Sequence, residues 1–483
     1  MTAATMALPA VAQPQPFPLP RLPFLPLLAL PFMGTDPESI DRIIVAMELL
    51  FLVCAVRQPI WVLGALMLSE LTVRNYFLNL GGLHISTRLF IALVSALIVL
   101  PRLPKAEFGQ RGRSMVLIAG LLLGLMTLAN AVSSNASYLA QYFRYTLTGF
   151  IAFLIIPVVL KSRDDVMRIG IVVLLIGMAS TVVALMQHYA FRGAPIIATV
   201  PNDVFDTGVE AWGGRALGLA ENPIYLTNDL LLLVLPLVGV LLTKAVPEKW
   251  RWHIGISAVL MFGALYFTQT RSWIVGAMPA LVAMAFLLSP RMRKDVLVLV
   301  LVVGVAFWAY SEHTGSRYTL GPSNDDSAAT RPVLWNVGLD IAKENPLLGV
   351  GHDKFLEISP EYASRVDRTL LRQQNAGDAL GRFEPHNDYL NIWLSFGTLA
   401  LAIYLLMMWC TLSNFRDAFK RLSDPLLRGI ALGSLGALIA LGINSFFHNF
   451  FDSVLTLWIL AGLSVALMTL ASKDPQPELE QAW

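Results

Sequence analysis

A histidine flanked by acidic and amide residues is the strongest catalytic candidate in this sequence. His386 follows Glu384 and precedes Asn387 and Asp388, just before an apolar run that begins at about residue 389. A neutral imidazole at a water–membrane boundary can accept a proton near neutral pH, and neighbouring carboxylates can orient it. We therefore predict that His386 is a general base supported by Glu384, Asn387 and Asp388. The competing interpretation is a histidine that caps the following helix.

Arginines at the ends of apolar runs are candidates for binding an anion. Arg271 lies in a tight hairpin between two such runs, where a guanidinium is costly unless it meets water, an anion or a carboxylate. Arg215 lies in a glycine-rich turn before a predicted helix start, and Arg331 begins another predicted helix. Guanidinium groups bind phosphates through paired N–H donors. We predict a diphosphate site formed by Arg215, Arg271 and Arg331 with support from Arg144, although each arginine alone is compatible with an exposed side chain.

Metal and hydrolase motifs are weak. Asp36, Glu38 and Asp41 form an acidic group that could hold a divalent cation, but a solvated loop explains them more simply. The histidines lack metal-ligand spacing, and the sequence contains no P-loop, GxSxG or HExxH motif. We predict neither a metal nor a cofactor. A further polar group in the last predicted hairpin, interpreted as structural, comprises Asn444, His448 and Asp452.

The composition shows what must position these residues. Only 14% of the 483 residues are charged and 56% are hydrophobic, a balance that excludes a disordered chain and argues strongly against a soluble enzyme. The net charge of +2 gives no indication of nucleic acid binding, and two cysteines exclude a disulfide scaffold. The sequence predicts an all-α polytopic membrane protein with about 12–14 transmembrane helices.

The apolar runs and the basic residues between them predict the topology. Lysines and arginines concentrate on the cytoplasmic side, and the basic segments at about 102–113, 161–168, 244–251, 291–294 and 416–428 all fall on one side. The predicted spans are about 40–56, 59–73, 87–100, 114–133, 139–160, 167–190, 224–243, 252–270, 272–289, 295–311, 389–412, 429–446 and 450–471. Residues 22–33 contain several prolines, so they either add a fourteenth, broken span or lie at the interface.

The outer side carries one long loop with secondary structure of its own. We predict a helical bundle over 1–311, a loop subdomain over 312–387, further helices of the same bundle over 388–472 and a cytoplasmic tail over 473–483. Within the loop, a helix is expected from about Arg331 to Asn345, capped by Thr330, and a second helix over about 360–374. The loop has eight basic and eleven acidic residues, so an anion site there must be a local arginine cluster.

Four short motifs make the chain resemble the O-antigen ligase and O-antigen polymerase superfamily, which acts in bacterial envelopes. Each motif is weak alone, but their order, spacing and common outer placement make the combination fairly specific. The motifs are Gly214–Gly218 with Asn222-Pro223, Thr270–Trp273, Arg331–Trp335 with Asn345–Gly351, and Pro385–Leu390 with Gly397.

The resemblance implies a GT-C-like glycosyltransferase of the inner membrane whose active site faces the periplasm. Such proteins transfer a glycan from undecaprenyl diphosphate to an acceptor hydroxyl, and the ligases do so without metal. The resemblance places Arg215, Arg271 and Arg331 on the diphosphate and His386 at the acceptor. It implies no nucleic acid partner: the partners are the lipid-linked donor, a lipid, glycan or other hydroxyl acceptor, and membrane lipids.

Several functions remain open from the sequence alone. A glycan ligase comes first, a polysaccharide polymerase second and a protein O-oligosaccharyltransferase third. A transporter or flippase of lipid-linked sugars belongs to a different class and predicts charges within the spans, with Glu48 and Glu70 as candidates. A metal-dependent glycosyltransferase would instead use Asp36, Glu38 and Asp41.

Overall fold

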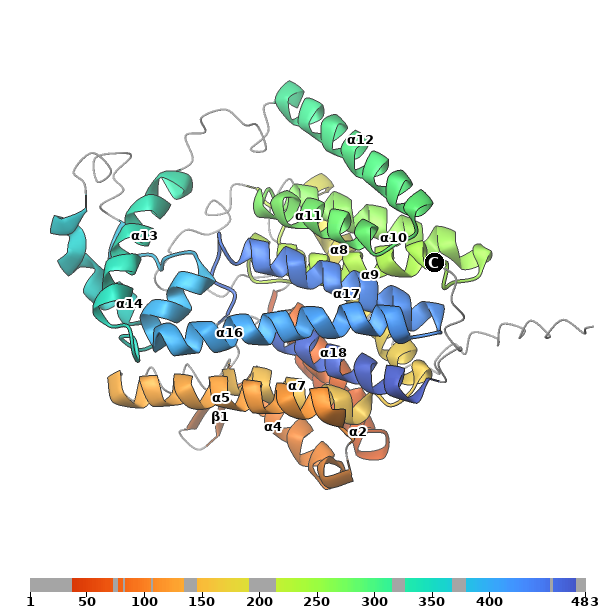
Figure 1. Ribbon diagram of the computed structural model, residues 1–483, viewed down its shortest axis with the longest axis horizontal. Coiled ribbons are helices and arrows are strands. Elements are labelled where there is room, and N and C mark those ends of the chain that lie inside the picture. Colours follow the sequence, from red (N-terminus) through yellow and green to blue (C-terminus); the bar gives the residue numbers. More distant parts are fainter. Residues whose placement is uncertain are drawn as a thin grey trace, which may run out of the picture.

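The structure is a computed structural model that describes residues 37–72, 77–80, 83–105, 107–133, 146–190, 214–314, 326–366, 379–451 and 455–474. Most of its long helices lie side by side, with α13 and α14 beyond one end of the bundle (Figure 1). The helices are α2 (Pro37–Arg57), α3 (Trp61–Leu71), α4 (Thr87–Val99), α5 (Gly109–Ser133), α7 (Thr148–Val159), α8 (Arg163–Tyr189), α9 (Pro223–Leu242), α10 (Glu248–Phe267), α11 (Ser272–Phe286), α12 (Pro290–Thr314), α13 (Asp326–Glu344), α14 (Lys354–Ile358), α16 (Asp388–Arg421), α17 (Pro425–Asn444) and α18 (Thr456–Lys473).

The remaining elements are small. Two 3-10 helices cover Leu100–Lys105 and Ser359–Arg365. Strands β1 (Phe77–Leu80) and β2 (Leu83–Ser86) form an antiparallel hairpin, with Phe77 opposite Ser86. This hairpin joins α3 to α4 and is the only departure from helix among the regular elements of the described residues.

The predicted fold class is confirmed, since every predicted apolar span contains a helix. Within the described residues, seven helical segments are long and apolar enough to cross a membrane: Thr87–Pro104, Gly109–Ser133, Arg163–Tyr189, Pro223–Leu242, Asp388–Arg421, Pro425–Asn444 and Thr456–Lys473. The shorter apolar helices are α3, α7 and α11. The chain is therefore an all-α, multi-pass membrane protein.

Ion pairs at one end of the bundle join segments that the charge pattern predicts on one side. Arg111 at the start of α5 meets Asp417 near the end of α16 at 2.5 Å, and Arg163 at the start of α8 meets Asp424, which precedes α17, at 2.8 Å. Lys473 at the end of α18 pairs with Glu107 at 2.8 Å. We call this the basic end; the opposite end holds α13 and the candidate site.

A break in α16 gives the site end its shape. The helix runs to Arg421, but Gly397 has a φ of +86° and interrupts it, which a single span over 389–412 does not predict. Gly351 N donates to Ser395 O at 2.9 Å, and Thr398 N donates to Pro346 O at 2.8 Å. The segment 346–351 thus satisfies backbone groups that the broken helix leaves open. A Cβ atom at residue 397 would overlap the Leu347 carbonyl, so this approach requires glycine.

The segment between α12 and α16 has a small core of its own. One face of α13 is buried through Leu334, Val337 and Ile341. They pack with Phe355 of α14 and with residues of the first part of α16. This core fixes α13 above the point where the chain re-enters the bundle.

Two predictions within this segment were wrong in detail. Helix α13 begins at Asp326 rather than Arg331, so Thr330 lies inside the helix instead of capping it. Ala328 and Ala329 favour helix and extend it toward the N-terminus, with Pro332 tolerated inside. The expected helix over 360–374 is replaced by α14 and the 3-10 helix up to Arg365, and residues 367–378 lie outside the described part.

Candidate active site

Arg215 is held by the hairpin that carries Arg271. Its Nε donates to Thr268 O at 2.8 Å, and its Nη2 donates to Thr270 Oγ1 at 2.7 Å. The next residue, Ala216, donates its backbone N–H to Phe267 O at 2.9 Å. These bonds join the turn before α9 to the end of α10, so two arginine-bearing segments distant in sequence become neighbours.

Helix α8 supports the same turn from behind. Gln187 Oε1 accepts from Leu217 N at 2.8 Å, and Ser180 Oγ accepts from Leu219 N at 3.0 Å. At the following helix start, Asn222 Oδ1 accepts from both Ile224 N and Tyr225 N at 2.9 Å. This side-chain cap occupies two of the first amides of α9, so the arginines are the groups here that can bind an anion.

The predicted hairpin between α10 and α11 is confirmed. Helix α10 ends at Phe267 and α11 begins at Ser272, with Arg271 immediately before it. Gln269 has a φ of +51°, an uncommon conformation for a residue other than glycine. Ser272 Oγ lies 3.0 Å from His448 Nε2, which brings the last hairpin of the chain against the residue next to Arg271.

Arg331 reaches the same region from α13. Its guanidinium carbon lies 5.9 Å from the ring centroid of Phe447. Trp335, one helical turn further on, donates its indole N–H to Pro385 O at 2.8 Å. Helix α13 is thereby bonded to the residue directly before His386, and residues four apart on a helix share a face.

His386 has a strained backbone and an unbonded ring. Its φ is +52°, in the left-handed region, where residues other than glycine are strained and often functional. Among the described residues, neither ring nitrogen has a hydrogen-bond partner, and the ring lies near Phe383. Burial and the Arg331 guanidinium lower the pKa of His386 to about 4. At neutral pH the imidazole is therefore in its neutral form.

The residues around His386 act on the segment between α17 and α18. Glu384 accepts a hydrogen bond from Asn449 Nδ2. Asn387, rather than His386, caps α16 by accepting from Leu390 N at 3.0 Å, so the capping interpretation of the histidine is wrong. Asp388 Oδ1 accepts from Phe450 N at 2.7 Å and from Phe451 N at 2.9 Å. These three predicted support residues therefore fix the local backbone.

His448 belongs to this group of residues, which the sequence reading did not foresee. Burial, followed by the positive charges of Arg331, His386 and Arg215, lowers the pKa of His448 well below its usual value. Three of the predicted site residues thus lie close enough to act electrostatically on one imidazole. The sequence located His448 in the last outer hairpin, but its contact with Ser272 joins residues 176 positions apart.

Some predicted residues lie outside the described part. Arg144, Asp36 and Asp452 are among them, and the side chains of Glu38 and Asp41 on α2 are not described either. Among the described residues, no group of three or more His, Cys, Asp and Glu side chains could hold a metal ion. The arginines are therefore the groups through which the described site can bind an anion.

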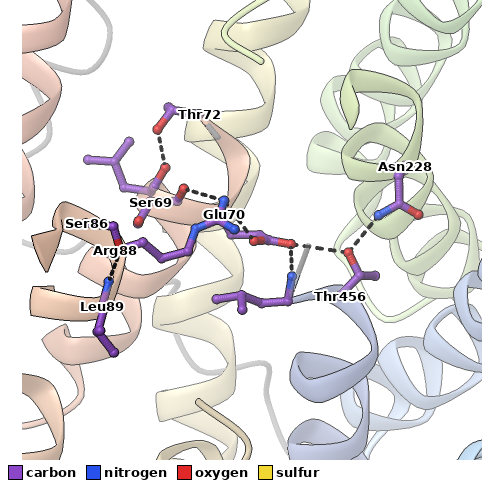
Figure 2. Close-up of polar contacts among 10 residues, drawn as sticks. Ser69, Glu70, Thr72, Ser86, Arg88, Leu89, Asn228 and Thr456 are labelled. Carbon is purple, nitrogen blue, oxygen red and sulfur yellow. Dashed lines mark hydrogen bonds and ion pairs between the residues drawn. The ribbon is translucent and has the colours of Figure 1, made fainter. Parts of the chain in front are cut away.

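A buried ion pair lies inside the bundle near the site end. Glu70 on α3 and Arg88 on α4 approach to 3.5 Å, and each side chain is less than 5% exposed. Figure 2 shows that Glu70 Oε1 accepts from Leu455 N at 2.6 Å and from Thr456 Oγ1 at 3.4 Å. Thr456 Oγ1 in turn accepts from Asn228 Nδ2 at 2.7 Å. The network ties α3 and α4 to α9 and α18.

Two further carboxyl groups are buried in the same part of the bundle. Glu48 on α2 is 4% exposed and Asp229 on α9 is 2% exposed. Both oxygens of Asp229 lack a hydrogen-bond partner within the described residues. The charges expected inside the spans at Glu48 and Glu70 are thus present, with Arg88 as the ion-pair partner of Glu70.

The comparison with protein families agrees with this geometry. A family model described as O-antigen ligase matches residues 256–405. The matched span contains Arg271, Arg331 and His386, whereas Arg215 and His448 lie outside it. A search of curated proteins gave no match. Residues 256–405 are therefore similar to the O-antigen ligase family.

Proposed function

We propose that the chain transfers a glycan from undecaprenyl diphosphate to an acceptor hydroxyl at the periplasmic face of a bacterial inner membrane. The observation that carries this proposal is the group of residues at the site end, where the Arg331 guanidinium carbon lies 5.9 Å from the Phe447 ring centroid and the backbone N–H of Asn387, next to His386, donates to Asn449 Oδ1 at 2.9 Å. The hairpin carrying Arg271 completes this group through Ser272. A cationic group beside a neutral base suits a reaction with an anionic leaving group and a hydroxyl nucleophile.

The arginines supply the leaving-group half of the reaction. When the bond between the anomeric carbon and the diphosphate oxygen breaks, the electron pair and its negative charge remain on the diphosphate. Guanidinium groups held by the protein stabilise such charge because they need no reorganisation during the reaction. Arg215 is oriented by Thr268 and Thr270, so its fork is fixed before the donor arrives. This arrangement provides charge stabilisation from the chain's own residues.

His386 supplies the acceptor half. Its unbonded imidazole takes the proton of the acceptor hydroxyl as the oxygen attacks the anomeric carbon. A direct displacement of this kind inverts the configuration at that carbon. Determining the anomeric configuration of donor and product by NMR tests this step, and a retained configuration would contradict it.

The decisive experiment is transfer by the purified protein supplied with carrier-linked glycan. We expect His386→Ala and Arg271→Ala to reduce the rate by about 10²–10⁴-fold, the range typical of acid–base and charge-stabilising residues. Arg382→Ala, which alters an exposed arginine close to His386 in sequence, is the matched control and should keep the rate. Full transfer by His386→Ala would remove the base assignment. Loss of transfer in chelator would favour the metal-dependent alternative instead.

The acceptor separates the closely related functions. Transfer to a lipid acceptor defines a ligase, transfer to a second carrier-linked glycan defines a polymerase, and transfer to a protein hydroxyl defines a protein O-oligosaccharyltransferase. Supplying the three acceptors in parallel to the same preparation distinguishes them. We place the ligase first.

The buried charges favour a second candidate of another class. Glu48, Glu70 and Asp229 lie inside the bundle, as a transporter or flippase of lipid-linked sugars would require. Such a protein would move labelled lipid-linked sugar across vesicle membranes without forming a new glycosidic bond. Translocation without transfer, unaffected by His386→Ala, would favour this candidate over the transferase.

A further inference from the structure

His448 is held at a fixed position relative to His386. Four hydrogen bonds, each with a backbone N–H as donor, join its segment, residues 445–451, to Asn387 and Asp388 at the start of α16. Asp388 N donates to Ser445 O at 2.8 Å, and Asn387 N donates to Asn449 Oδ1 at 2.9 Å. The backbone N–H groups of residues 450 and 451 both donate to the Asp388 carboxylate. Because these bonds end one and two residues after His386, the two histidines are positioned by the same backbone.

One side of the His448 ring is bonded and the other is open. Its Nε2 lies 3.0 Å from Ser272 Oγ, and the ring centroid lies 5.5 Å from that of Phe450. Within the described residues, Nδ1 has no hydrogen-bond partner. A serine hydroxyl donates to a neutral imidazole nitrogen and accepts from a protonated one. Ser272 can therefore satisfy His448 in either protonation state.

Two arginines act electrostatically on His448. Arg331 on α13 and Arg215 in the turn before α9 both disfavour its protonated form, and the Arg331 guanidinium carbon lies 5.9 Å from the ring centroid of Phe447, the residue before His448. The nearby Asp388 carboxylate is engaged by the amides of residues 450 and 451. Burial and these cations lower the pKa of His448, so the imidazole is neutral while the site holds no anion. An anion bound among the same groups would cancel their repulsion and favour protonation.

We propose that His448 takes up a proton together with the donor diphosphate and then acts as a fourth cationic ligand of that group, with Ser272 Oγ accepting from its Nε2. This inference rests on the proposed function. A donor diphosphate diester carries two negative charges, and a third develops when the bond to the anomeric carbon breaks. The acceptor proton goes to His386, the new bond joins the acceptor oxygen to the anomeric carbon, and protonated His448 stabilises the charge left on the diphosphate.

The two histidines would then carry opposite protonation states when donor is bound. His386 must be neutral to accept a proton, whereas His448 must be protonated to bind the leaving group. Their contacts fit this division, because His448 has a hydroxyl partner for a charged ring and His386 has none among the described residues. Proton uptake on donor binding should therefore depend on one histidine and not on the other.

Titration calorimetry with a dialkyl diphosphate tests the proposal. This probe keeps two charges throughout the working pH range, so any proton taken up must bind to the protein. Full-length protein is titrated at pH 7 in buffers that differ in ionisation enthalpy, and the dependence of the heat on the buffer gives the number of protons taken up. We expect close to one proton per ligand for the wild type. His448→Gln should lose that proton and weaken binding about tenfold, whereas His386→Gln should retain it.

Two further variants sharpen the readout. Ser272→Ala leaves the imidazole but removes its hydroxyl partner. Proton uptake on diphosphate binding should therefore persist, but the pH at which His448 is half protonated in the complex should be lower. His253→Gln changes a histidine on α10, towards the basic end, and is the matched control that should change nothing. If His448→Gln does not fold, the pH dependence of wild-type affinity still decides. Above the pKa of His448 in the free protein, the affinity for the diphosphate must fall about tenfold per pH unit.

The outcomes separate this inference from the proposed function. Binding without proton uptake, or with uptake unchanged in His448→Gln, would overturn the role of His448 and leave the diphosphate site standing. Failure of the wild type to bind the diphosphate at all would overturn the diphosphate site, and the role of His448 with it. Affinity that stays constant with pH would likewise contradict the coupling.

Discussion

Arg215 Nη2 donates a hydrogen bond to Thr270 Oγ1 at 2.7 Å, across 55 positions of the sequence. Two of the three arginines of the proposed diphosphate site are thereby joined, since Thr270 directly precedes Arg271. Thr268 O takes a second bond from the same guanidinium, at 2.8 Å. A fork held at two points has less freedom to lose when it binds a phosphate, so this hairpin orients Arg215 before the donor arrives.

Removing the Thr270 hydroxyl should therefore weaken donor binding. Thr270→Val keeps the shape of the side chain but leaves one donor of Arg215 without its partner, a change of about 1 kcal/mol. We expect the KM for the carrier-linked donor to rise about fivefold to tenfold. Initial rates over a range of donor concentrations measure it. Thr270→Ser retains the hydroxyl and is the control, and an equal change in both variants would contradict the role of the bond.

The pH dependence of transfer should report the low pKa of His386. In a His448→Gln background, which removes the proton uptake proposed for donor binding, kcat/KM should stay level below pH 6 and decline only as His386 protonates, because the pKa of His386 lies at about 4 in the free protein. Arg331 contributes to the lowering, so removing its charge in Arg331→Met should raise the pKa and shift the acidic decline to higher pH. Arg382→Met is the control. An acidic limb that does not move in Arg331→Met would contradict this electrostatic coupling.

Much of the fold could be predicted because a lipid environment limits how a chain can behave. A segment in lipid must satisfy its own backbone hydrogen bonds, so each apolar run predicts a helix, and each predicted run contains one. Basic residues predicted which helix ends lie together, and the Arg111–Asp417 and Arg163–Asp424 pairs agree. Both signals are local in sequence and need no knowledge of packing.

The parts that escaped prediction depend on contacts between distant segments. The break at Gly397 is stabilised by backbone groups of residues 346–351, so glycine in an apolar run did not reveal it. His448 faces Ser272 only because residues 445–451 are fixed on the start of α16. Motif order gave His386 and three arginines as candidates for the site, whereas His448, a histidine outside any motif, became a candidate only from the tertiary structure.

Replacing Gly397 should destabilise the site end. Gly397→Ala adds a Cβ that overlaps the Leu347 carbonyl and imposes a φ of +86° on an L residue. We expect a lower apparent Tm, corresponding to more than about 1 kcal/mol for the left-handed backbone alone. Gly263→Ala is the matched control, since its Cβ meets nothing within 4 Å in the middle of α10 and alanine favours helix. Equal Tm values for both variants would show that the break tolerates a side chain.

Neutralising Glu70 should be far more damaging than neutralising an exposed acid. Glu70→Gln leaves Arg88 buried without its compensating charge, and breaking one partner of such a pair costs roughly 3–5 kcal/mol. Glu107→Gln breaks the exposed pair with Lys473 and should have little effect. The fraction of protein that stays monodisperse after heating measures the loss of stability in each of the two variants. Recovery in the double variant Glu70→Gln with Arg88→Met would show that the unpaired charge, rather than lost packing, is responsible.

The orientation of the bundle can be tested with single cysteines in a chain whose Cys54 and Cys410 are replaced by alanine. Glu361→Cys lies in the exposed 3-10 helix at the site end, and Glu248→Cys lies at the exposed start of α10 near the basic end. If the basic end is cytoplasmic, a membrane-impermeant maleimide added to intact cells with a permeabilised outer membrane labels only Cys at 361. Inside-out vesicles should give the reverse pattern. Labelling of position 248 from outside would put the arginine cluster in the cytoplasm, where it could not act on a donor displayed in the periplasm.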